Sequence, residues 1–135
     1  YVGYSAIREV DATSTALAFP AVYRKLTGGS DETWSTTLVQ NIDPYTSGSL
    51  EVTFYSTSGT PVAGPYTVSL PAGGFARLNL FNGGNLPGDA LLALGTYFSG
   101  SMYVTPSSGV RVVAVNQIFW PVADRASGYD GFPVP

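Results

Sequence analysis

The 135-residue sequence contains no cysteine and no histidine. Without cysteine the chain has neither disulfides nor thiolate metal sites. Without histidine it lacks the usual general base near neutral pH and both the Ser-His and Cys-His nucleophile pairs. Because the commonest metal ligands are missing as well, we expect no metal and no cofactor.

Charge is also scarce. Charged residues make up 11% of the chain, against about 25% in an ordinary soluble domain. The net charge is −3, Lys25 is the single lysine, and the basic residues are scattered, so we expect no nucleic-acid partner. No apolar run approaches the roughly 18 residues that span a bilayer, so we expect no membrane insertion. The polar surface must come from 14 serines and 13 threonines.

The acidic residues do not form a catalytic or metal-binding pattern. A glycosidase needs two carboxylates that face each other across a cleft, and Glu9, Glu32 and Glu51 are the only glutamates. Calcium needs six to eight oxygen ligands, but no Asp-x-Asp spacing occurs. We therefore predict that the chain is not an enzyme and that its loop acids are solvated.

Apolar and polar residues alternate along most of the chain, which is typical of β-strands. The clearest case is residues 50–55, in which Leu50, Val52 and Phe54 share one face and Glu51 faces solvent. A turn signal separates this run from residues 66–70, and the two runs are predicted to form a hairpin. Further strands are expected at residues 16–24, 34–42, 76–80, 101–105 and 110–119.

Two local signals modify this pattern. Pro20 interrupts the first strand, which makes it an edge or a bulged strand. Residues 89–94 are the one stretch that could form a helical turn, with Asp89 as a possible cap.

Seven or eight short strands with turns between them predict an all-β fold, an antiparallel immunoglobulin-like β-sandwich. A closed barrel is the competing architecture. The sandwich is favoured because residues 43–49 and 82–95 look like loops that cross between sheets. We predict an extended N-terminal assembly segment at residues 1–12, a β-sandwich domain at 13–126 and an extended, proline-rich C-terminal segment at 127–135.

The two ends share a Gly-Tyr phrase, since the chain begins YVGYSAI and ends SGYDGFPVP. An extended segment of about 12 residues reaches about 40 Å, and a β-sandwich has edges that a foreign strand can complete. A frayed terminus is the alternative, but both ends are rich in large apolar residues. The predicted assembly-interface residues are Tyr1, Val2, Tyr4, Ile7, Val10, Phe19, Tyr129 and Phe132.

Residues 16–23 and 110–119 are apolar on both faces. A sheet in a small sandwich has one buried face. Part of this apolar surface is therefore expected to meet another copy of the chain, unless long loops cover it.

The aromatic residues suggest an alternative function. Trp34, Trp120 and the nine tyrosines could form a platform for sugar rings. Trp34 can equally pack in the core, and Trp120, which precedes Pro121, can close one end of the sandwich. Trp120 is the predicted glycan contact in this alternative.

Short motifs in the sequence resemble the β-sandwich repeat modules of large secreted and cell-surface proteins of bacteria, of the fibre or surface-layer type. These motifs are AFPAVYR (18–24), LVQN (38–41), VTFY (52–55), SGTPV (58–62), LPAG (70–73), GSMYV (100–104), VAVNQ (113–117) and GYDGF (128–132). The resemblance implies a spacer, adhesive element or fibre subunit without catalytic residues.

These observations lead to one functional expectation and one alternative. The chain is expected to be an extracellular or cell-surface structural subunit that joins copies of itself head to tail into a filament, a pilus-like fibre or a sheath. Joining would occur by strand addition, with residues 1–12 as the donor strand. The alternative is a carbohydrate-binding or adhesion module with glycans as partners.

Overall fold

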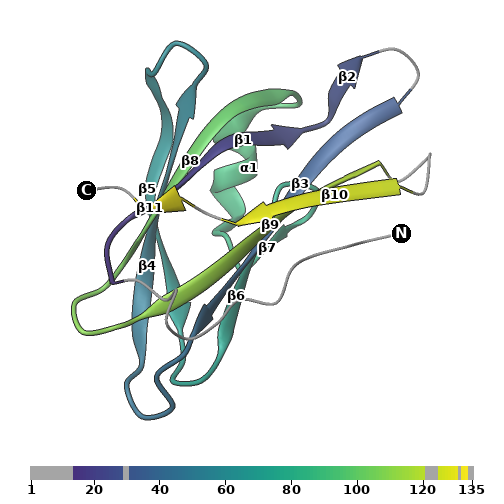
Figure 1. The fold of residues 1–135 in the computed structure, drawn as a ribbon. Coiled ribbons are helices and arrows are strands. Elements are labelled where there is room, and N and C mark those ends of the chain that lie inside the picture. Colours follow the sequence, from purple (N-terminus) through teal and green to yellow (C-terminus); the bar gives the residue numbers. More distant parts are fainter. Residues whose placement is uncertain (1–13, 29–30, 121–124, 131, 134–135) are drawn as a thin grey trace.

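The structure, a computed structural model, describes residues 14–28, 31–120, 125–130 and 132–133; of residues 26–28, 31, 119–120 and the last two ranges it describes the backbone. Two antiparallel sheets pack face to face, with one short helix beside them (Figure 1). The predicted β-sandwich is confirmed.

The strands divide between the two sheets in a fixed order. Sheet 1 has the order β11 (Phe132–Pro133), β1 (Leu17–Arg24), β8 (Phe98–Pro106), β4 (Gly48–Ser56), β5 (Pro61–Leu70). Sheet 2 has the order β10 (Arg125–Asp130), β9 (Val112–Trp120), β3 (Asp31–Asn41), β6 (Phe75–Asn79), β7 (Gly83–Gly84), and β2 (Leu26–Gly28) pairs with β3. The helix α1 (Gly88–Leu94) lies between β7 and β8 in the chain.

The chain crosses between the sheets repeatedly. Of the described strands, eight have five or more residues, and among these only β4–β5 and β9–β10 are consecutive partners within one sheet. Such crossing is typical of Greek-key sandwiches. The narrower immunoglobulin-like type is not confirmed, because that fold pairs its first two strands, whereas β1 and β3 lie in opposite sheets.

The local predictions for the strands hold. The expected hairpin is β4–β5, with Leu50 opposite Val68. β1 is bulged rather than an edge strand, because its register with β8 shifts between Phe19 and Val22, around Pro20, and it lies between β8 and β11.

The helix differs in detail from the prediction. α1 spans seven residues rather than one turn, and its buried residues Ala90 and Leu94 pack into the core. The predicted cap at Asp89 is wrong: Pro87 occupies the N-cap position without a side-chain cap, and Asp89 lies in the first turn. Among the described residues, no helix has the length and apolar character needed to span a bilayer.

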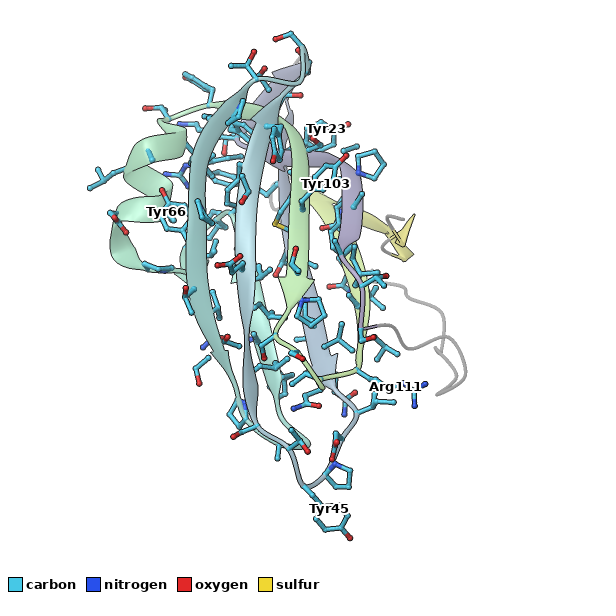
Figure 2. All side chains as sticks on the ribbon, turned by 90° about the vertical axis from the view of Figure 1, so that its left-hand side faces the viewer. Tyr23, Tyr45, Tyr66, Tyr103 and Arg111 are labelled. Atoms are coloured by element: carbon cyan, nitrogen blue, oxygen red, sulfur yellow. The ribbon has the colours of Figure 1, made fainter. Side chains whose placement is uncertain are left out.

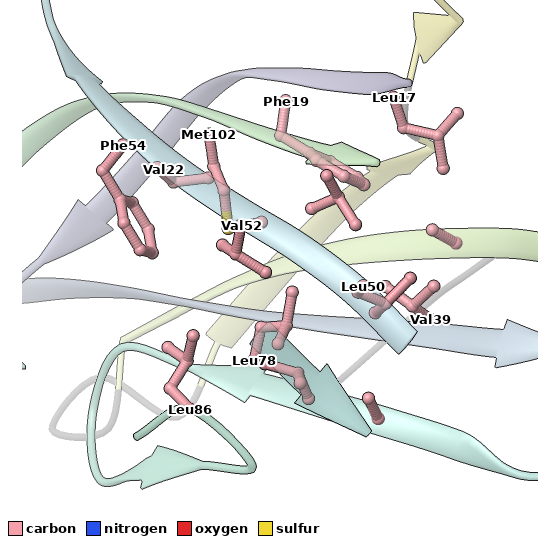
Figure 3. Close-up of a cluster of buried hydrophobic side chains, with 14 of the residues drawn as sticks. Leu17, Phe19, Val22, Val39, Leu50, Val52, Phe54, Leu78, Leu86 and Met102 are labelled. Carbon is pink, nitrogen blue, oxygen red and sulfur yellow. The ribbon is translucent and has the colours of Figure 1, made fainter. Parts of the chain in front are cut away.

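The core lies between the inner faces of the two sheets (Figure 3). Leu50, Val52 and Phe54 are fully buried, as the alternation predicted, and Glu51 is exposed. The rings of Phe54 and Phe98 meet edge to face with centroids 5.8 Å apart. This aromatic pair joins β4 and β8 in the centre of sheet 1.

The described residues of the C-terminal segment form edge strands that pair within the chain. β10 pairs with β9 from Arg125 to Asp130, and β11 pairs with β1. β10 therefore crosses the domain boundary predicted at residue 126. One short stretch of chain supplies an edge strand to each sheet.

Candidate assembly edge

Among the described strands, β10 lies at one edge of sheet 2. Its register places Ala126 opposite Phe119, Gly128 opposite Gln117 and Tyr129 opposite Asn116. In the described part of the chain, β10 pairs with β9 alone. No described strand pairs with the other side of its backbone, and an edge strand of this kind is a possible template for another strand.

The other sheet edges are less suitable for strand addition. β5 includes Pro61 and Pro65, which lack an N–H group, and its register with β4 shifts twice. The helix α1 also packs against β5. β7 and β11 have two residues each, whereas β10 has six residues and no proline. β10 is thus the longest proline-free edge strand among the described residues.

An apolar patch lies on the outer face of sheet 2, beside this edge. It consists of Val113 and Val115 on β9, Leu38 on β3 and Phe75 on β6. Val115 lies directly opposite Leu38, whereas Gln40 separates Val113 from Phe75, so Leu38 is the member of the patch that the other three surround. Leu38 is 42% exposed and Phe75 is 53% exposed, while both valines are half-buried.

Polar groups lie beside and within the patch. The guanidinium carbon of Arg77 lies 5.8 Å from the ring centroid of Phe75, and the exposed Gln40 lies between Val113 and Phe75. Protein–protein contacts combine apolar and polar side chains in this way. Two residues of the patch lie on β9, the strand that pairs with β10.

The inner face of the same sheet is polar next to β10. Thr37 Oγ1 donates a hydrogen bond of 2.8 Å to Asn116 Oδ1, and both residues are buried. Asn116 Nδ2 is buried without a partner in the described part of the chain. A buried donor without an acceptor costs free energy, and Trp34 Nε1 on β3 is a second such donor among the described residues.

The structure separates the residues predicted for the assembly interface. Phe19 is fully buried in the core, so it offers no surface to another copy. Tyr129 lies on β10 opposite Asn116, and Phe132 lies on β11 opposite Ala18. The N-terminal members, which are Tyr1, Val2, Tyr4, Ile7 and Val10, lie outside the described residues.

The two tryptophans have different positions. Trp34 is buried, and its ring meets Phe81 edge to face with centroids 4.6 Å apart. Its packing excludes it from an exposed sugar platform. Trp120 ends β9 opposite Arg125, and its side chain lies outside the described residues.

Sequence reasoning found the apolar outer face of β9 but missed Leu38 and Phe75. Leu38 could have been predicted from the sequence. Leu38 and Val39 are consecutive apolar residues of one strand, and consecutive side chains point to opposite faces of a sheet, so one of the two must face outward. Phe75 follows Gly73 and Gly74, and because of this turn signal the strand was expected to begin only at residue 76. Within the described residues, no three His, Cys, Asp or Glu side chains come together as metal ligands would.

Comparison with known proteins identifies no relative. No protein-family model, no curated protein and no solved structure matches the chain. The resemblance to bacterial surface modules therefore stays a prediction.

Proposed function

We propose that this protein is an extracellular structural subunit that assembles head to tail with copies of itself into a filament, fibre or sheath. In this proposal, residues 1–12 of one copy add as a strand to the open edge of β10 in the next copy. The observation that supports it best is this edge, which is six residues long, free of proline and next to an exposed apolar patch.

The dimensions suit such a junction. A six-residue strand is about 20 Å long, and 12 extended residues reach about 40 Å. Half of the N-terminal segment can therefore pair with β10 while the other half bridges to its own domain. Main-chain hydrogen bonds would provide the affinity, as in other cases of strand addition.

The shared Gly-Tyr phrase supports the choice of this edge. Near the C-terminus, the phrase at Gly128 and Tyr129 forms β10 itself beside β9. A similar phrase at Gly3 and Tyr4 can therefore fit the next strand position of the same sheet. Packing of the neighbouring domain onto Leu38, Phe75, Val113 and Val115 would then bury the apolar patch.

Composition supports an extracellular location. The polar surface depends on serine, threonine and tyrosine hydroxyls rather than on charge. The fold consists mainly of two packed sheets, an architecture that suits a subunit whose role is mechanical.

Because the chain has no cysteine, a crosslinking experiment can test the junction directly. One chain carries Ser5→Cys, activated as a mixed disulfide, and a second chain of different tag carries Ser127→Cys on β10. Mixing them should give a disulfide-linked heterodimer, because the junction holds the two positions close together. The product is measured on a non-reducing gel over time.

The matched control replaces Ser127→Cys by Ser108→Cys, which lies in the exposed turn between β8 and β9. The proposal predicts at least about tenfold slower crosslinking with this control, since its two thiols meet only by random collision. Equal rates for the two mixtures, or no heterodimer in either, would contradict the proposed junction.

A further inference from the structure

Hydroxyl groups make up much of the outer face of sheet 1, especially along β4 and β8. Successive outward residues on β8 and β4 alternate with the buried core residues of the same strands. With their neighbours on β1 and β5, the outward hydroxyl-bearing residues are Tyr23, Ser49, Thr53, Tyr55, Thr67, Ser69, Ser99, Ser101, Tyr103 and Thr105. This face therefore offers many donors and acceptors on a nearly continuous surface.

Three tyrosines gather at one end of this face. Tyr55 lies opposite Ser101, Tyr103 lies opposite Thr53 and Ala18, and Tyr23 lies opposite Ser99. The rings of Tyr55 and Tyr103 meet at an angle of 66° with centroids 5.1 Å apart. Figure 2 shows Tyr23 and Tyr103 on the same part of the sheet, and Tyr45 at the far end of the molecule.

These rings are accessible at the surface. Tyr103 is 38% exposed, and Tyr23 and Tyr55 are half-buried. Tyr23 lies opposite Ser99, which is four residues before Tyr103 on β8. The two tyrosines are therefore about 13 Å apart along the strand direction. A ligand that contacts all three rings must therefore be elongated.

Charge is nearly absent from this face. Glu51 is the one charged side chain among the described outward residues of β4, β5 and β8. Arg24, at the end of β1, is occupied: its Nε donates to the Gly95 carbonyl at 2.8 Å and its Nη1 to the Leu80 carbonyl at 2.7 Å. The face therefore has no free cation for phosphate or carboxylate groups and repels them through Glu51.

The geometry points to a binding site for a neutral polysaccharide on this face, with Tyr23, Tyr55 and Tyr103 as its aromatic contacts. Sugar rings have apolar faces that pack on aromatic rings, and their hydroxyls match the serine and threonine side chains. A protein partner would favour an apolar centre, and the described outward residues here provide none comparable to the patch on sheet 2. A nucleic acid would require basic residues.

The site is independent of the proposed assembly edge. The tyrosines lie on the outer face of sheet 1, whereas β10 and the apolar patch belong to sheet 2. A subunit joined through sheet 2 would keep the tyrosine face open to solvent. Binding of polysaccharide can therefore be measured whether or not the protein polymerises.

Affinity electrophoresis tests the site with defined probes. Native gels contain xylan, mixed-linkage β-glucan or galactomannan as neutral polymers, and polygalacturonate as an acidic one. The full chain should be retarded by at least one neutral polymer and not by polygalacturonate. Retardation by the acidic polymer alone, or by none of the four, would overturn the inference.

Variants then locate the site. Tyr55→Ala combined with Tyr103→Ala should weaken retardation at least about tenfold, because both ring contacts are lost. Tyr103→Phe keeps the ring and should retain most of the binding. Tyr45→Ala is the matched control, since Tyr45 is 92% exposed and remote from the face.

A second substitution keeps the test valid if the double variant misfolds. Ser101→Glu adds bulk and charge beside Tyr55 and Tyr103 without removing a ring. It should abolish retardation while the unfolding temperature stays near that of the parent chain. Binding that is unchanged in Ser101→Glu and in the double variant would show that the polymer binds elsewhere and would overturn the site.

Discussion

Asp43 stabilises the turn between β3 and β4 through backbone hydrogen bonds. Its Oδ1 accepts from the N–H of Tyr45 at 2.8 Å and from that of Thr46 at 3.1 Å. The bond from Tyr45, followed by the side-chain and backbone bonds from Thr46, lowers the pKa of Asp43 below its ordinary value of 3.8. The folded state thus prefers the ionised carboxylate more strongly than the unfolded state does.

The pH dependence of stability follows from this lowered pKa. The contribution of Asp43 is fully present above pH 3.8 and is lost as the pH falls through the lower pKa of the folded state. Asp43→Asn should therefore be less stable than the parent at pH 7, and the difference should shrink toward pH 2. Urea unfolding at several pH values measures this.

Glu51→Gln is the control for loss of one negative charge, because Glu51 is exposed on β4. A difference between parent and Asp43→Asn that stays constant from pH 7 to pH 2 would contradict the role of the ionised carboxylate.

Single residues were predictable where alternation was strong. Leu50, Val52, Phe54 and Glu51 face the expected sides because a strand alternates strictly. Phe19 was expected at an interface, but it shares the parity of the buried Leu17 and lies in the core, and the bulge at Pro20 then makes Val22 the next buried residue of β1. A bulge of this kind depends on the register with the neighbouring strand, which a single sequence does not contain.

At the scale of elements, the close packing of β4 and β8 depends on Gly100. A Cβ atom at this position would clash with the carbonyl oxygen of Tyr55 and lie 2.7 Å from Cζ of Phe98. The carbonyl belongs to the β4–β8 ladder, in which Tyr55 pairs with Ser101, so it cannot move aside without loss of pairing.

Gly100→Ala should therefore lower the free energy of unfolding by about 2 kcal/mol or more. Gly88→Ala is the matched control, because nothing lies within 4 Å of the added Cβ. The control should stay within about 1 kcal/mol of the parent, with any gain coming from helix propensity in α1. Equal destabilisation of the two variants in urea unfolding would show that close approach at Gly100 does not limit the packing.

Most long strands could be predicted, but the C-terminal ones could not. β4, β5, β8 and β9 have alternating or continuous apolar runs that predict strands. β10 has the sequence RASGYD, which lacks both patterns. Its strand conformation comes from pairing with β9, and such long-range context overrides local preference.

At the scale of the whole molecule, the class of fold followed from the sequence and the arrangement did not. Many short strands with turn signals between them predicted a sandwich, in which each sheet buries one face. The order of strands depends on which loops cross between the sheets. The loops 43–49 and 82–95 do cross, as expected, since they join β3 to β4 and β6 to β8.

The two outer faces give the molecule two different surfaces. Sheet 2 has an open edge and an apolar patch, whereas sheet 1 has a hydroxyl-rich face with three tyrosines. Only the part of the patch on β9 could be foreseen, from the apolar residues on both faces of that strand, and the tyrosine face could not, because it depends on the alignment of β1, β4 and β8. The proposed functions assign assembly to the first surface and polysaccharide binding to the second.

The central claim is that residues 1–12 join neighbouring copies. Sedimentation velocity over a range of concentrations, for the full chain and for a chain lacking residues 1–12, tests it most directly. Strand addition through residues 1–12 should give concentration-dependent polymers of the full chain, and a folded monomer with unchanged circular dichroism for the shortened chain. A full chain that is monomeric at every concentration, or a shortened chain that polymerises equally, would rule out this junction.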